Sequence, residues 1–155
     1  MKHYPKFVTY YSYKGGVGRT SALVNAATMR AMAGNNVVII DFDLEAPGVG
    51  AYLKKLNPAY DQKREGILEY LYDAVSGQKI PSLIDRAINL TADLKGSNGG
   101  KLWSISAGNT SDRLYSKRLE SLKWGEIFEK KFGELLLKNL KNQIASEFEN
   151  PDYVF

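Results

Sequence analysis

The sequence has no cysteine and only one histidine, His3. Without cysteine, the chain has no disulfide framework, no thiolate zinc site and no thiol nucleophile. No apolar run approaches the roughly 20 residues that a membrane-spanning helix needs. The first residues also lack the apolar segment and the small-residue cleavage site of a signal peptide. These absences indicate a cytoplasmic protein without sulfur chemistry, in which His3 is a solvated terminal residue rather than a catalytic base.

The composition that remains is that of one globular domain. Of the 155 residues, 44% are hydrophobic and 25% are charged, as is typical of such domains. The net charge of +4 predicts a solvated basic surface, and attraction of nucleic acid or anionic lipid is the alternative. The same alternatives, a solvated face or a nucleic-acid contact, apply to a loose basic stretch. That stretch contains Arg113, Lys117, Arg118 and Lys123.

The N-terminal part of the chain predicts a strand, a helix and a second strand. Residues 7–11, FVTYY, are rich in the β-branched and aromatic side chains that strands favour. Residues 20–33 place small and apolar side chains at helical spacing, and Gly34 ends the pattern. Residues 37–41, VVIID, form an apolar run typical of a buried parallel strand. This order predicts a right-handed βαβ unit in an α/β fold, with a mostly parallel sheet flanked by helices and with ligands at the carboxyl ends of its strands.

Later patterns are shorter and less regular. We expect helices at 67–75, 80–90 and 126–147, a loop at 96–100, a strand at 102–106 and the start of another strand at 152–155. The second of these helices begins at Pro81. Apolar residues recur at spacings of three and four along 126–147, so this helix is expected to pack on the sheet. A helix that binds a partner or a membrane surface is the alternative.

A glycine-rich segment lies between the first strand and the first helix. A standard Walker A loop reads G-x-x-x-x-G-K-[ST]; its backbone N–H groups surround phosphates and its hydroxyl binds magnesium. Aligned on Gly18, this chain has Tyr13 at the first glycine position, Arg19 at the lysine position and Thr20 as the hydroxyl. The helix that follows directs its positive end at the same anion. The segment therefore predicts a phosphate-binding loop.

Arginine in place of lysine keeps the positive charge of the loop but changes its geometry. The guanidinium of Arg19 is planar and forked, whereas an ammonium is a point charge. Two consequences stay open from the sequence. In one, Arg19 donates hydrogen bonds to two phosphate oxygens. In the other, Arg19 lies slightly away from the γ-phosphate, and hydrolysis is slower.

Residues 13–20, YKGGVGRT, resemble the signature of the ParA/MinD-like ATPases, the deviant Walker A family, in a KGGVGR-motif variant. In this family the lysine matched by Lys14 reaches across an ATP-sandwich dimer to the partner's phosphates. The resemblance continues in an apolar strand that ends in Asp-x-Asp, matched by Asp41 and Asp43. It implies that Asp43 positions the attacking water and that Asp41 supports the metal region. It is firm over residues 7–50 and extends to 102–108.

The resemblance implies an ATP- and Mg²⁺-binding P-loop NTPase that works as a nucleotide-dependent dimer. Lys14 and Asp43 are the expected catalytic residues, and Thr20, with Asp41 acting indirectly, is expected at the metal. Tyr13 is expected to touch the nucleotide or the partner, or to do neither. The expected nucleotide-binding residues are Lys14, Gly15, Gly16, Val17, Gly18, Arg19, Thr20 and Ser21.

The family also has a further strand that ends in a magnesium-site aspartate, and residues 151–155 resemble the start of that strand. We therefore expect residues 1–155 to be the N-terminal part of one domain, with an unpaired sheet edge and with weak or undetectable ATP hydrolysis. The leading expectation is an ATPase switch that engages a protein partner or an appended domain. The alternatives are a non-hydrolysing nucleotide sensor within a larger assembly and an ATP-dependent DNA-binding partition protein.

Overall fold

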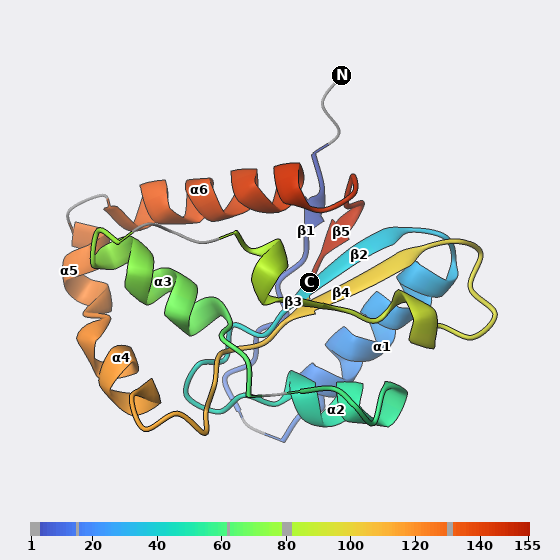
Figure 1. The fold of residues 1–155 in the computed structure, drawn as a ribbon, viewed down its shortest axis with the longest axis horizontal. Coiled ribbons are helices and arrows are strands. Elements are labelled where there is room, and N and C mark those ends of the chain that lie inside the picture. The colour runs from blue at the N-terminus through green and yellow to red at the C-terminus, as the bar shows by residue number, and fades with distance from the viewer. Residues whose placement is uncertain (1–3, 15, 62, 79–81, 130–131) are drawn as a thin grey trace.

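A five-stranded, mostly parallel sheet lies at the centre of the fold, with helices on both faces (Figure 1). The computed structural model describes residues 4–14, 16–61, 63–78, 82–129 and 132–155. The strands are β1 (Lys6–Phe7), β2 (Asn36–Ile40), β3 (Ala87–Asn89), β4 (Lys101–Ile105) and β5 (Tyr153–Val154). The α-helices are α1 (Arg19–Met32), α2 (Val49–Leu56), α3 (Ile67–Val75), α4 (Tyr115–Ser121), α5 (Trp124–Glu129) and α6 (Phe132–Glu147), and the 3₁₀ turns are η1 (Ile84–Arg86) and η2 (Thr91–Asp93).

The strand order is β1-β5-β2-β4-β3. The last strand in the sequence, β5, lies between the first two and is parallel to both, with Val154 paired to Phe7 on one side and to Val38 on the other. Strand β2 is also parallel to β4, and only the edge strand β3 is antiparallel to its neighbour. The carboxyl ends of β1, β5, β2 and β4 therefore meet at one edge, where α/β sheets bind ligands.

Strand β2 is buried on both faces, as its continuous apolar run predicts. Val37 and Ile39 face one apolar cluster, which also contains residues of α1 and α2. Val38 faces the opposite cluster, which contains residues of α3, α4, α5 and α6. Figure 1 shows the same division, with α1 and α2 on one side of the sheet and α3 and α6 on the other. The α/β architecture is thus confirmed.

The predicted helix at 20–33, strand at 37–41, helix at 67–75 and strand at 102–106 are confirmed to within one residue at each end. Helix α1 lies close to the sheet because its buried face is made of small residues such as Ala27 and Ala31, which are fully buried. The predicted strand at 7–11 is shorter, because β1 ends at Phe7. The N–H of Val8 nevertheless still donates to the carbonyl of Val154 at 2.8 Å.

The predicted helix at 80–90 is wrong over the residues that the structure describes, and Ile80 and Pro81 lie outside them. Residues 84–86 form η1 and residues 87–89 form β3. Antiparallel pairing with β4 decides this conformation: Ile88 lies opposite Ser104, and the N–H of Leu90 donates to the carbonyl of Leu102 at 2.8 Å. These are contacts with a distant segment, which local spacing does not reveal.

Two helices, α2 and α4, were not expected from the sequence. The expected helix at 126–147 corresponds to α5 and α6, and the junction at residues 130–131 lies outside the described residues. Leu136, Leu140 and Ile144 of α6 are buried against the sheet, which confirms a packing helix. Within the described segments, no helix has both the length and the apolar character needed to cross a membrane.

Candidate functional site

The glycine-rich loop joins β1 to α1, so it leaves the carboxyl edge of the sheet. Gly16 and Gly18 have φ angles of 75° and 79°, a left-handed conformation that glycine adopts without strain. No atom lies within 4 Å of the position that a Cβ would take at either residue. The backbone conformation, rather than a lack of space, therefore explains the glycines. Gly15 lies outside the described residues.

The loop ends at the start of α1, and Gly18 is the residue before its first turn. No side chain caps this helix end, and its first turn contains no acidic residue. The first N–H groups of a helix have no partner within the helix, and the helix dipole is positive there. Ser21 belongs to this turn, and the regular bonding of the helix begins where the N–H of Ala22 donates to the carbonyl of Gly18 at 2.9 Å. This end suits an anion.

Two predicted site residues that are far apart in the sequence meet at this end of α1. A guanidinium nitrogen of Arg19 lies 2.5 Å from Oδ2 of Asp43, and the two side chains are 32% and 35% exposed. Arg19 opens α1, whereas Asp43 lies three residues after β2. The glycine-rich loop and the Asp-x-Asp segment thus form one cluster at the carboxyl edge of the sheet.

Asp41 is 5% exposed and holds the segment after β2 together. Its Oδ1 accepts the N–H of Asp43 at 3.3 Å, and its Oδ2 accepts the N–H groups of Gly48 and Val49, both at 3.1 Å. Burial raises the pKa of the Asp41 carboxyl, and the backbone hydrogen bonds oppose that rise. Asp41 therefore caps α2 and closes residues 41–49 into a loop. The sequence did not predict this role, and its role near a metal stays a prediction.

Thr20 lies against that same loop. A Cβ added at Gly48 would lie 3.4 Å from Oγ1 of Thr20, so the hydroxyl is adjacent to the backbone that Asp41 caps. Thr20, Arg19, Asp41 and Asp43 all line a cleft of about 600 Å³. The cleft is otherwise mainly apolar, with walls formed by the ends of β1 and β5 and by α6.

Lys14, the expected partner-facing residue, lies outside this cleft, and so do Tyr13 and Val17. Lys14 and Val17 are exposed, and Tyr13 is 95% exposed. The Tyr13 ring makes an edge contact with the ring of Tyr11, with centroids 6.1 Å apart. The structure therefore places Lys14 and Tyr13 at the surface, where a second molecule can reach them.

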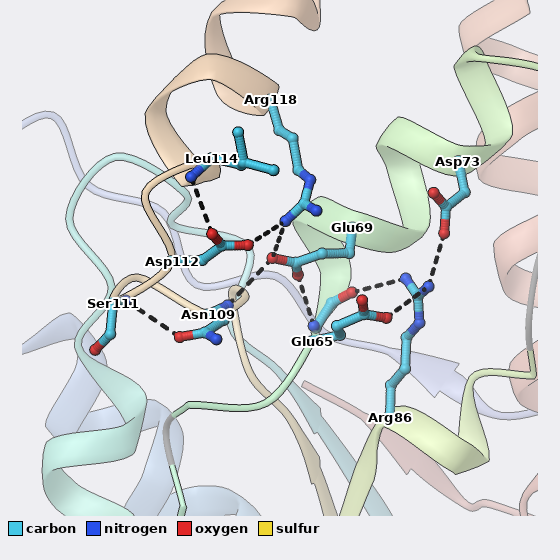
Figure 2. A network of polar contacts seen from close by, with 10 residues as sticks. Glu65, Glu69, Asp73, Arg86, Asn109, Ser111, Asp112, Leu114 and Arg118 are labelled. Atoms are coloured by element: carbon cyan, nitrogen blue, oxygen red, sulfur yellow. Dashed lines mark hydrogen bonds and ion pairs between the residues drawn. The ribbon is translucent and has the colours of Figure 1, made fainter.

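A polar network away from the loop was missed in the sequence. Glu69 of α3 is 2% exposed and accepts the N–H groups of Gly66 at 2.8 Å and Asn109 at 3.2 Å. Arg118 of α4 lies 3.7 Å from Glu69 and 2.8 Å from Asp112 (Figure 2). The interpretation of Arg118 as part of a solvated basic face is therefore wrong, because it joins α4 to α3 and to the turn after β4.

Arg86 extends the network to the other side of α3. Its side chain is 4% exposed and lies 2.8 Å from Asp73 and 3.2 Å from Glu65. It also donates to the carbonyl of Gly66 at 3.3 Å. Both arginines pair with carboxylates of this chain, so the network is best explained as a structural one. Clustered charges of opposite sign in adjacent helices are the only sequence signal for it.

Comparisons with family models, curated proteins and solved structures found no match to this chain. The loop motif and the contact between Arg19 and Asp43 are therefore the features that bear on function.

Proposed function

We propose that this chain binds ATP with Mg²⁺ at residues 14–20 and works as a nucleotide-dependent dimer of the ParA/MinD-like kind. One observation carries the proposal. The glycine-rich loop leads into an uncapped helix end, and Arg19 at that end meets Asp43 at 2.5 Å on the carboxyl edge of a parallel sheet. The two halves of the sequence motif thus meet at an uncapped helix end, a place that suits an anion.

Each residue of the cluster has a role in this proposal. The loop N–H groups and the N-terminus of α1 bind phosphate oxygens. The guanidinium of Arg19 neutralises phosphate charge and donates hydrogen bonds. Asp43 orients the water that attacks the γ-phosphate during ATP hydrolysis.

The donor set suits a magnesium ion that arrives with the nucleotide. The described residues contain no group of three metal-ligating side chains. Mg²⁺ in nucleotide sites keeps several waters and takes few protein ligands, with substrate phosphates supplying others. The hydroxyl of Thr20 would be the direct protein ligand. Bound magnesium supplies charge neutralisation at the phosphates.

The dimer belongs to the same proposal. Lys14 is exposed at the start of the loop rather than paired with Asp43, which contacts Arg19 instead. A lysine in this position is available to the phosphates of a second copy. Tyr13, which is 95% exposed, lies next to it and would be covered in such a dimer.

Isothermal titration with ATP and Mg²⁺ tests the binding. We expect the wild type to bind and Arg19→Ala to bind about 10- to 100-fold more weakly, since hydrogen bonds to charged groups contribute about 1.5–3 kcal/mol. Arg113→Ala is the matched control, because Arg113 is exposed and lies outside the loop. A wild type that does not bind, or equal weakening by both variants, would contradict the proposal.

A further inference from the structure

We infer that Asp43 is an internal competitor for the anion at the phosphate loop. The first turn of α1 has no acidic residue of its own, yet a carboxylate oxygen of Asp43 lies 2.5 Å from the Arg19 guanidinium. That oxygen occupies the position at which Arg19 would meet a phosphate oxygen. The inference rests on the proposed function and concerns the regulation of the same site.

Asp43 is held in this position by its own loop as well as by Arg19. Its Oδ1 accepts the N–H of Ala46 at 3.2 Å, and its N–H donates to the buried carboxylate of Asp41 at 3.3 Å. When Arg19 turns to a phosphate, these two bonds keep Asp43 near the loop. The entering anion therefore breaks an ion pair and then faces an uncompensated negative charge, and both effects weaken its binding.

The substitution Asp43→Asn removes the negative charge of the side chain but keeps its size and shape. Its side-chain oxygen still accepts the N–H of Ala46, and the backbone bond to Asp41 is unaffected. An ion pair about one third exposed contributes up to about 1 kcal/mol, so Asp43→Asn should bind a phosphate anion about fivefold more tightly. This gain in affinity should become smaller at high salt, since salt screens the interactions of exposed charges.

Titration calorimetry with inorganic pyrophosphate and a chelator, without divalent cations, tests this inference. Glu45→Gln is the matched control, because it removes one negative charge two residues away. Glu45 is exposed, and it has no hydrogen bond or ion pair within the part of the chain that the structure describes. We expect Asp43→Asn to bind about fivefold more tightly than wild type and Glu45→Gln to change affinity less than twofold.

A double-mutant cycle with Arg19→Ala isolates the ion pair. If Asp43 competes with the anion for Arg19, the gain in pyrophosphate affinity from Asp43→Asn becomes smaller in the Arg19→Ala background. Equal affinity of wild type and Asp43→Asn, or an equal gain from Glu45→Gln, overturns the inference while ATP binding still stands. Failure of the wild type to bind either pyrophosphate or ATP with Mg²⁺ overturns both proposals. Thermal unfolding of each variant checks that all of them fold.

Discussion

The hydroxyl of Tyr115 anchors the loop that carries Asp43. This α4 side chain is 7% exposed and donates to the carbonyl of Leu44 at 2.8 Å. Burial, together with the negative charges of Glu69, Asp41 and Asp43, raises the pKa of Tyr115 to about 12. Asp43 therefore stays near Arg19 partly because of a hydrogen bond from a helix that lies far along the chain.

Removing this hydroxyl should destabilise the protein in a pH-dependent way. We expect Tyr115→Phe to lower the free energy of unfolding by about 1 kcal/mol at neutral pH, which is typical for one buried hydrogen bond. The neutral phenol is favoured in the folded state, so its contribution is complete below the unfolded pKa of about 10. It is lost as pH rises from there towards the folded pKa, which is about 12.

Urea unfolding of wild type and variant at several pH values measures this difference. Tyr52→Phe is the control, because Tyr52 is 37% exposed and its hydroxyl makes no hydrogen bond in the described part of the chain. A wild-type advantage over Tyr115→Phe that grows above about pH 10 would contradict the assignment.

Elements with a strong local signal were predictable from the sequence. Helix α3 and strand β2 have clear periodicity or a continuous apolar run, and both are confirmed. Strand β3 was not predictable, because pairing with β4 selects its conformation. Helix α2 was missed because its first turn depends on the buried carboxylate of Asp41. The errors therefore fall where a distant side chain or strand decides the local structure.

Helix α3 begins so close to the chain after β4 that no side chain fits at position 66. Gly66 precedes α3, and a Cβ there would lie 2.1 Å from the carbonyl oxygen of Ser106 and 2.7 Å from the backbone nitrogen of Gly108. Backbone atoms cannot move aside cheaply. We expect Gly66→Ala to lower the free energy of unfolding by about 1–3 kcal/mol, as overpacking does.

Gly125→Ala in α5 is the control, since no atom lies within 4 Å of its added Cβ. Alanine favours helix over glycine, so this variant should be neutral or stabilising by up to about 1 kcal/mol. Chemical denaturation compares the two. Equal stability of Gly66→Ala and wild type would show that α3 shifts away from β4 without a penalty.

The sequence predicted which segments form the candidate site but not how their charges pair. The α/β order placed residues 14–20 and 41–43 at the same edge of the sheet. It did not reveal that Arg19 contacts Asp43 or that Asp41 bonds to backbone N–H groups, because spacing does not specify which charged groups meet. Lys14, in contrast, is exposed, which the proposed role across a dimer requires.

The proposed dimer gives a prediction for the intact molecule. In the presence of a non-hydrolysable ATP analogue, we expect Lys14→Ala to weaken dimer formation about tenfold or more. The variant loses the positive charge that would bind the phosphates held by the second copy. Nucleotide binding by the monomer should change less. Sedimentation velocity over a range of protein concentrations measures dimer formation, and calorimetry measures nucleotide binding by the monomer.

Lys95→Ala serves as the control, since Lys95 is exposed and precedes β4 at the opposite edge of the sheet. It removes the same charge far from the loop. Equal dimer formation by wild type and Lys14→Ala would exclude a role for this lysine across the interface.

The position of β5 also has a consequence for synthesis of the protein. Strands β1 and β2 leave the ribosome early, but β5, the strand that pairs with both, is translated long after them. Pairing over such a sequence distance slows folding. Until β5 inserts, β1 lacks its pairing partner and β2 has a free edge within the described part of the chain, and such edges favour aggregation. The sheet edge that carries the candidate site is thus complete only after β5 has been translated, long after the glycine-rich loop.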